Sequence, residues 1–138
     1  MFMASSALAG IGYFLVIVCS PYWKNYDKVV NGVIVVLLAL AYTGCNFSQP
    51  FLQTMKDFSN FEGVMRIFTN PILVIAAWVH ILGFDLFVAV WIKKDAVQRG
   101  MKHVWVIPAL LVMIPFGPLG YLVYLVSRWI YSRRLSTV

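Results

Sequence analysis

A histidine and an aspartate lie close together in an otherwise apolar stretch, and their side chains could carry proton-transfer chemistry. His80 and Asp85 fall within the run from Pro71 to Ile92, which contains no other charged residue. A carboxylate near the middle of a bilayer costs about 2.5–3.5 kcal/mol on insertion scales, so it usually marks a functional site or a paired structural group. Two interpretations follow: a substrate, proton or ion site, or structural side chains bonded to Tyr, Trp or Ser of neighbouring helices.

The helix that must carry these two residues also carries a set of aromatic side chains. Successive residues of a helix rotate by about 100°, so His80 and Asp85 point about 140° apart and cannot pair directly. Both still face protein if this helix is central in its bundle. The aromatic residues either line a slot for a flat apolar molecule or pack against lipid and other helices: Trp78, Phe84, Phe87 and Trp91.

A second unusual stretch, Ile114–Gly120, places two prolines and two glycines inside an apolar segment. Proline removes a backbone donor and clashes with the preceding turn, so we expect the helix to kink or open there. Backbone groups freed inside a membrane must find partners or line a protein-buried cavity. Helix rise places this break level with His80, which makes Pro115, Gly117 and Pro118 candidate lining residues unless the break is a plain packing kink.

The composition indicates an integral membrane protein. Hydrophobic residues make up 62% of the 138 positions and charged residues 12%, against about 25% charged residues in soluble domains. The mean hydropathy is +0.83. Only helices can span here, because open sheet edges are not tolerated in lipid. We predict an all-α fold, one domain over residues 1–138 with four transmembrane helices: Phe2–Cys19, Val29–Phe47, Pro71–Ile92 and Val104–Ile130.

The loop between the second and third predicted spans, Ser48–Asn70, has the apolar spacing of an amphipathic helix lying in the membrane interface. Four crossings place both chain ends on the side of this loop. That side then holds five Lys and Arg residues and the opposite side six, so the positive-inside rule does not decide the orientation. The net charge of +6 fits anchoring at anionic lipid on either face and requires no nucleic-acid partner.

A metal site is conceivable from residue types but not from their spacing. His80, Asp85, Asp95 and His103 could all ligate a metal. Asp95 and His103 belong at the interface, however, while His80 lies about 18 Å deeper. No His-x-x-His, Glu-x-x-His or paired-carboxylate spacing occurs. We therefore predict no metal site.

Several motifs of the second half occur in a fixed order. They are Trp78-x-His80-x-x-x-x-Asp85-Leu86-Phe87-Val88, Trp91-Ile92-x-x-Asp95, Pro108, and Phe116-Gly117-Pro118-Leu119-Gly120 followed by Arg128. In this order and spacing they resemble a family of small membrane proteins similar to plant neoxanthin synthase, named for an abscisic-acid-deficiency locus. The chain departs from the family pattern at Ala89-Val90, where Gly-Arg is expected.

This resemblance implies a role in carotenoid or other isoprenoid metabolism, in a bacterial inner (photosynthetic) membrane or a plastid thylakoid membrane. The plant members are associated with converting violaxanthin to neoxanthin, an isomerisation in which an epoxide opens while a proton is lost, without net redox change. On this hypothesis Asp85 is the acid at the epoxide oxygen and His80 the base at the polyene carbon. Trp78, Phe84, Phe87 and Trp91 would then line the slot, with the carotenoid as substrate or bound pigment.

The resemblance leaves an alternative from another class. The chain could be a non-catalytic subunit of a larger membrane complex, such as a pigment–protein or photosynthetic complex, that scaffolds or binds pigment. The amphipathic loop would then be a docking element.

Overall fold

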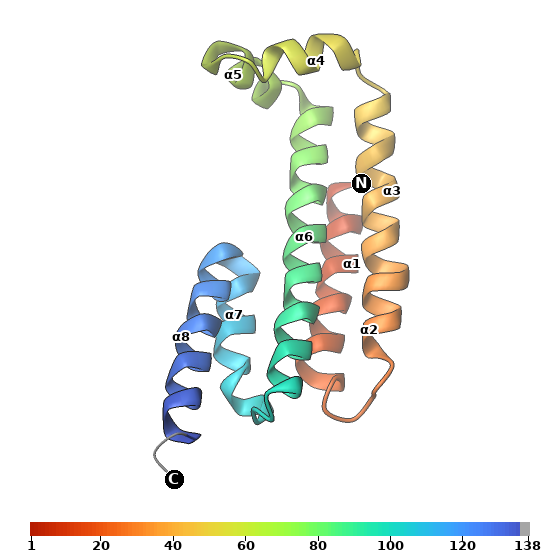
Figure 1. Cartoon of the computed structure of the whole chain (residues 1–138). Helices are drawn as coiled ribbons and strands as arrows, with labels where there is room; N and C mark the ends of the chain where they lie inside the picture. The colour runs from red at the N-terminus through yellow and green to blue at the C-terminus, as the bar shows by residue number, and fades with distance from the viewer. Residues whose placement is uncertain (136–138) are drawn as a thin grey trace.

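Three long apolar helices form the body of the molecule (Figure 1). The computed structural model describes residues 1–135, and the regular structure in that part of the chain is helical. The helices cover Phe2–Cys19, Tyr26–Phe47 and Pro71–Gln98, each long and apolar enough to cross a membrane. The first consists of α1 (Phe2–Phe14) and η1 (Leu15–Cys19), the second of α2 (Tyr26–Val29), η2 (Val30–Val35) and α3 (Val36–Phe47), and the third is α6.

The first span agrees with the sequence prediction, whereas the other two are longer than predicted. Helix α6 continues beyond Ile92 because charged residues of its last turns have partners, such as Lys94, whose Nζ lies 2.6 Å from the Asp27 carboxylate of α2. At its start, the Asn70 side chain accepts hydrogen bonds from first-turn backbone N–H groups. Pro71 follows at a position where no donor is needed.

The fourth predicted span is a helical hairpin instead of a single helix. After the short turn η3 (His103–Trp105), α7 (Ile107–Phe116) and α8 (Pro118–Leu135) meet at Gly117 and pack side by side in antiparallel directions. With ten residues, α7 rises about 15 Å, half of a ~30 Å hydrocarbon core. The prediction of one crossing over Val104–Ile130 is therefore wrong, and α8 returns to the end of the molecule where α7 begins (Figure 1).

Proline and glycine explain why the chain reverses here. Pro115 and Pro118 lack backbone donors and weaken the helix on both sides of Gly117. Gly117 has φ 22° and ψ −89°, a conformation that residues with a side chain rarely adopt. A Cβ atom on Gly120 would lie 2.6 Å from the carbonyl oxygen of Ala109, so this glycine lets α7 and α8 approach closely.

The loop between α3 and α6 folds into two short helices across the top of the bundle in Figure 1, α4 (Phe51–Asp57) and α5 (Phe61–Thr69). Asn60 caps α5 by accepting a first-turn backbone N–H at 2.7 Å. Arg66 Nη2 lies 2.7 Å from the Asp57 carboxylate and connects the two helices. The two helices and the residue that follows α4 expose large apolar side chains: Phe51, Leu52, Met55, Phe58, Phe61, Met65 and Phe68.

Asp95 connects α6 to the hairpin. Its Oδ2 atom accepts a hydrogen bond from the buried Tyr124 hydroxyl of α8. The same oxygen lies 2.8 Å from Arg99 Nε and 3.4 Å from Arg128 Nη1. Asp95 therefore has cationic partners, although Val90 stands where the resemblance described above leads one to expect an arginine.

A buried lysine and a histidine fix the end of the first span. The Ile17 carbonyl lacks its usual helical donor because Pro21, four residues on, has no N–H. His103 Nε2 lies 2.7 Å from this carbonyl oxygen, so Nε2 must carry the proton and donate. Nδ1 then accepts from Nζ of Lys93, at 2.7 Å, and the neutral imidazole joins α6 to the first span.

This arrangement predicts a stability that decreases in acid. Burial and, to a smaller extent, the nearby Lys93 cation lower the pKa of His103 from its ordinary value of 6.5, against the opposing effect of the Ile17 carbonyl. Because the unfolded chain binds the proton more tightly, the contribution of this site to stability is complete above about pH 6.5. It is lost as the pH falls from there through the lower pKa of His103 in the folded protein. We expect the thermal midpoint in detergent to decrease between pH 7 and pH 5, and to decrease less in His103→Gln. An equal decrease in both proteins would contradict this role of His103.

Candidate functional site

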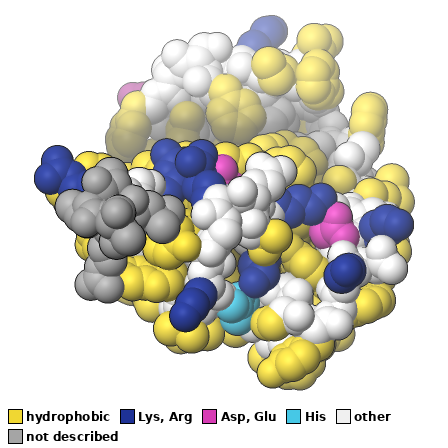
Figure 2. Space-filling model, turned by 60° about the horizontal axis from the view of Figure 1, so that its bottom comes forward, with side chains coloured by type: hydrophobic (Ala, Val, Ile, Leu, Met, Phe, Trp, Pro, Cys, Tyr) yellow, Lys and Arg dark blue, Asp and Glu magenta, His cyan; other side chains and the backbone are white. Residues whose placement is uncertain are grey.

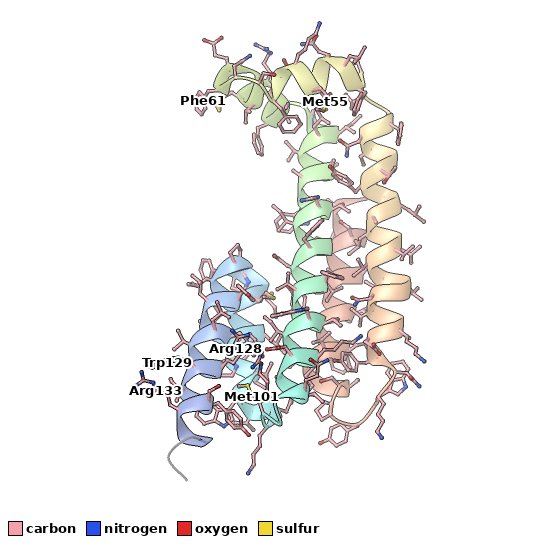
Figure 3. All side chains as sticks on the ribbon, in the orientation of Figure 1. Met55, Phe61, Met101, Arg128, Trp129 and Arg133 are labelled. Atoms are coloured by element: carbon pink, nitrogen blue, oxygen red, sulfur yellow. The ribbon has the colours of Figure 1, made fainter. Side chains whose placement is uncertain are left out.

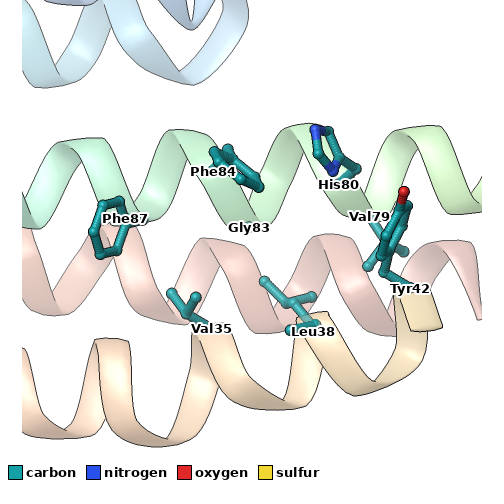
Figure 4. Close-up of a pocket in the computed structure, with 9 residues that line it drawn as sticks. Val35, Leu38, Tyr42, Val79, His80, Gly83, Phe84 and Phe87 are labelled. Atoms are coloured by element: carbon teal, nitrogen blue, oxygen red, sulfur yellow. The ribbon is translucent and has the colours of Figure 1, made fainter.

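An apolar groove of about 530 Å³ runs between the second span and α6 (Figure 4). Leu38 and Val79 are buried at its base. Phe84 and Phe87 are 61% and 50% exposed, so the groove opens toward the surroundings of the helices. The residues that line it are Val35, Leu38, Ala39, Tyr42, Val79, His80, Gly83, Phe84 and Phe87.

His80 and Tyr42 supply the polar side-chain atoms of this groove. Their ring centroids lie 5.2 Å apart, and the His80 ring centroid lies 4.6 Å from that of Phe84, one turn further along α6. The imidazole therefore lies between one ring from α3 and one from its own helix. Figure 4 shows His80 and Tyr42 together at one end of the groove, with Phe87 at the other.

A second cavity of about 290 Å³ lies beside the first, between α3 and α4. Tyr42 lines both cavities. The second cavity also has the polar side chains of Thr43, Asn46 and Thr54, so it differs in chemistry from the apolar groove. The two cavities share Tyr42 as a lining residue, and the second adds these polar side chains to a lining that also includes Phe47, Phe51, Met55 and Phe58.

Asp85 lies on the other side of α6, against the hairpin turn. A Cβ atom on Gly117 would lie 2.6 Å from one carboxylate oxygen of Asp85 and 2.7 Å from the other. This position is beside the N-terminus of α8, where partial positive charge favours a carboxylate. Asp85, Gly117, Pro118 and Tyr121 line a small cavity of about 250 Å³ there.

The structure thus separates His80 from Asp85, as the predicted difference in direction requires. It also corrects the predicted depth of the broken stretch, because Gly117 lies level with Asp85 and not with His80. The hairpin causes this change: a helix that ends halfway through a span reaches the middle of α6. One epoxide group in the groove could not contact both side chains.

The predicted aromatic slot is divided among three neighbours. Phe84 and Phe87 line the groove, but Trp78 donates from Nε1 to Ser6 Oγ of α1 at 3.0 Å. Trp91 packs on Tyr121 of α8, with ring centroids 5.9 Å apart. Pro115 lines none of the three cavities described above. Within residues 1–135, no group of three His, Cys, Asp or Glu residues could hold a metal ion.

Tyr42 was not among the site residues predicted from the sequence. A tyrosine in an apolar span resembles an ordinary packing residue. Its position opposite His80 depends on how α3 packs against α6. Thr43 and Asn46 could not be assigned for the same reason.

Comparison with known proteins gives one match at the level of families. The sequence model of the family described as ABA DEFICIENT 4-like matches residues 1–124. This match covers the three spans, the groove, the hairpin turn and the first part of α8. Searches of curated proteins and of solved structures gave no match. Since the matched region covers most of its length, this membrane protein belongs to the ABA DEFICIENT 4-like family.

Proposed function

We propose that this protein binds a carotenoid-like polyene in the groove between α3 and α6, and that it isomerises an epoxy-carotenoid there, as plant neoxanthin synthase is associated with doing. The observation that carries the proposal is the groove itself: an apolar, lipid-open channel that ends at His80 and Tyr42. Family membership supports the same chemical class of ligand.

The two adjoining cavities suit a xanthophyll better than a plain hydrocarbon. The apolar groove would hold the conjugated chain against Phe84 and Phe87. The more polar cavity beyond Tyr42 would hold a hydroxylated end ring, whose hydroxyl group could donate to the side-chain oxygens of Thr43 and Asn46. The Thr43 hydroxyl and the Asn46 amide already donate to backbone carbonyls of α3, which leaves their oxygens as acceptors. Because the groove opens along one side, the rest of a long molecule could extend into lipid.

The proposed reaction needs a base and an acid on one end group. His80 would take the proton from the polyene carbon while the carbon–oxygen bond of the epoxide breaks, and the oxygen would gain a proton and become a tertiary alcohol. No electrons are exchanged with another molecule. Tyr42 is the hydroxyl that lines the groove with His80, so we assign it the acid role. Asp85 could act as the acid only on a group that reaches the hairpin side of α6.

A non-catalytic role is the second candidate, and the separation of His80 from Asp85 favours it. A subunit that holds pigment inside a larger membrane complex needs the groove but no paired acid and base. Under this alternative Asp85 would stabilise the hairpin turn, and the exposed apolar faces of α4 and α5 would dock on a partner.

Substitution of His80 distinguishes the two candidates. In liposomes supplied with violaxanthin, we expect His80→Ala to lower turnover by roughly 10²–10⁴-fold, the usual contribution of a general base. Tyr42→Phe should also lower it, while bound carotenoid remains. Ile81→Ala is the matched control, because Ile81 is exposed on the same helix and does not line the groove. Full turnover by a folded His80→Ala variant would contradict catalysis at this histidine.

The proposal also includes the position of α4 and α5 and the membrane in which the protein is located. We infer that α4 and α5 lie in the membrane interface with their exposed phenylalanine and methionine side chains in the acyl region, since amphipathic helices of this kind bind there. Family membership is the ground for proposing a plastid or bacterial photosynthetic membrane as the location.

A further inference from the structure

Charge is distributed very unequally between the two ends of the bundle. The end that carries the α4–α5 segment has Lys56 and Arg66 against Asp57 and Glu62, so its charges cancel. The opposite end, which we call the basic end, has two acidic residues, Asp27 and Asp95. Its described basic side chains are Lys24, Lys28, Lys93, Lys94, Arg99, Lys102, Arg128 and Arg133.

The hairpin is the reason for this asymmetry. A continuous fourth span would have carried Arg128 and Arg133 to the other side of the membrane. Because α8 turns back, both arginines lie toward the end where Met101 follows α6 (Figure 3), and Arg128 reaches Asp95 at 3.4 Å. Figure 2 shows the Lys and Arg side chains gathered on this face, with few acidic side chains among them.

The two acidic residues are already paired within the protein. Asp27 contacts Lys94, and Asp95 contacts Arg99 and Arg128. Lys24, Lys28 and Lys102 are exposed and form no ion pair within residues 1–135. These three ammonium groups therefore remain available to an external anion, and an uncompensated excess of positive charge surrounds them.

Aromatic side chains at the same end place it at a lipid–water boundary. Tyr22 and Trp129 are 90% and 57% exposed, and Trp23 is also exposed. The Trp105 and Tyr131 rings contact each other with centroids 6.3 Å apart. Tryptophan and tyrosine concentrate where acyl chains meet headgroups, because their rings are apolar and their tips polar. Basic groups just outside such a belt meet lipid headgroups.

We propose that the basic end is a binding surface for anionic lipid headgroups, and that it fixes the orientation of the protein. Lys24, Lys28 and Lys102 contact the headgroups, while the paired arginines contribute to the positive field. The positive-inside rule then places this end and the last turn of α8 on the side from which the chain is inserted, and the α4–α5 segment on the opposite side. The inference is independent of what the groove binds.

The direct test measures lipid preference. Purified protein is equilibrated with equal amounts of phosphatidylglycerol and phosphatidylcholine in detergent, and retained lipids are counted by native mass spectrometry. We expect a clear preference for phosphatidylglycerol that high salt weakens. The Lys24→Gln/Lys28→Gln/Lys102→Gln variant should lose it by roughly tenfold or more, because each basic residue near an anionic surface contributes several-fold in affinity.

Lys56→Gln is the control, since it removes an exposed lysine from the other end. Circular dichroism verifies that each variant stays folded, as surface lysines should allow. No preference in the wild-type protein, or an equal loss in Lys56→Gln, would overturn the proposal. Orientation is tested with an impermeant maleimide on a Lys102→Cys variant in which the free cysteines Cys19 and Cys45 are replaced by serine. We expect no labelling in intact cells and full labelling after the cells are permeabilised, whereas labelling in intact cells would overturn the assigned orientation.

Discussion

Gly117→Ala is expected to destabilise the protein by roughly 2–5 kcal/mol, combining backbone strain with steric overlap. The hairpin turn needs φ 22° and ψ −89° at this position, which an alanine adopts only with strain. The new methyl group would also lie 2.6 Å from an Asp85 carboxylate oxygen. Thermal unfolding in detergent measures the loss.

The sign of this effect distinguishes the hairpin from a continuous helix. In an unbroken span, Gly→Ala would stabilise the helix by about 1 kcal/mol. Gly10→Ala is the control, because a Cβ atom there meets nothing within 4 Å and Gly10 lies in the regular helix α1. A Gly117→Ala variant as stable as Gly10→Ala would contradict the turn geometry. Adding Asp85→Ala should recover the steric part of the loss and leave the backbone part.

Ala39→Trp is expected to abolish polyene binding in the groove, with an affinity loss of at least roughly tenfold. Ala39 lines the groove and is exposed on α3, so an indole ring there fills space that a ligand would need. Tryptophan is compatible with a lipid-facing helix position, so the fold should remain. Titration of the purified protein with a xanthophyll, followed by absorption spectroscopy, measures the change.

Ala7→Trp is the matched control for this experiment. Ala7 is exposed on α1 and lines none of the three cavities described above. It introduces the same side chain and the same apolar area at another surface. Equal loss of binding in both variants would mean that the polyene associates with the apolar exterior in general. Unchanged binding in Ala39→Trp would exclude the groove as the site.

The sequence was sufficient to predict the three spans. Each is a long apolar run that ends at charged or turn-forming residues, and the start of α6 at Asn70-Pro71 follows from local capping chemistry. It did not show how far α6 extends, because Lys93 and Lys94 read as the end of an apolar run. Their partners, His103 and Asp27, become visible only when distant segments pack together.

The hairpin could not be distinguished from a kinked helix by sequence. Pro115, Gly117 and Pro118 are compatible with both, since a kink and a reversal use the same residue types. Tertiary contacts decide between a kink and a reversal. These are the close approach of α7 and α8 that Gly120 allows and the contact of the turn at Gly117 with Asp85. The prediction of a continuous fourth span also distorted the count of basic residues on the two sides of the membrane. It placed the arginines of α8 at the end that carries α4 and α5, whereas they lie toward the opposite end.

The relative placement of the candidate residues was predicted in part. Helical geometry separated His80 from Asp85, and the structure confirms that they line different cavities. Phe84 and Phe87 share the His80 side of α6 and line its groove. Periodicity alone could not show which neighbouring helix covers each face of α6. Trp78 and Trp91 were therefore grouped with Phe84 and Phe87, although in the structure Trp78 contacts α1 and Trp91 contacts α8.

The proposed function requires that the groove between α3 and α6 holds a polyene. The most direct test is gentle detergent purification of the chain from its native membrane, followed by absorption spectroscopy and mass identification of what co-purifies. We expect a stoichiometric xanthophyll on the wild-type protein that is missing from Ala39→Trp and present on Ala7→Trp. Wild-type protein that carries no polyene, or Ala39→Trp protein that carries as much as the wild type, would contradict it.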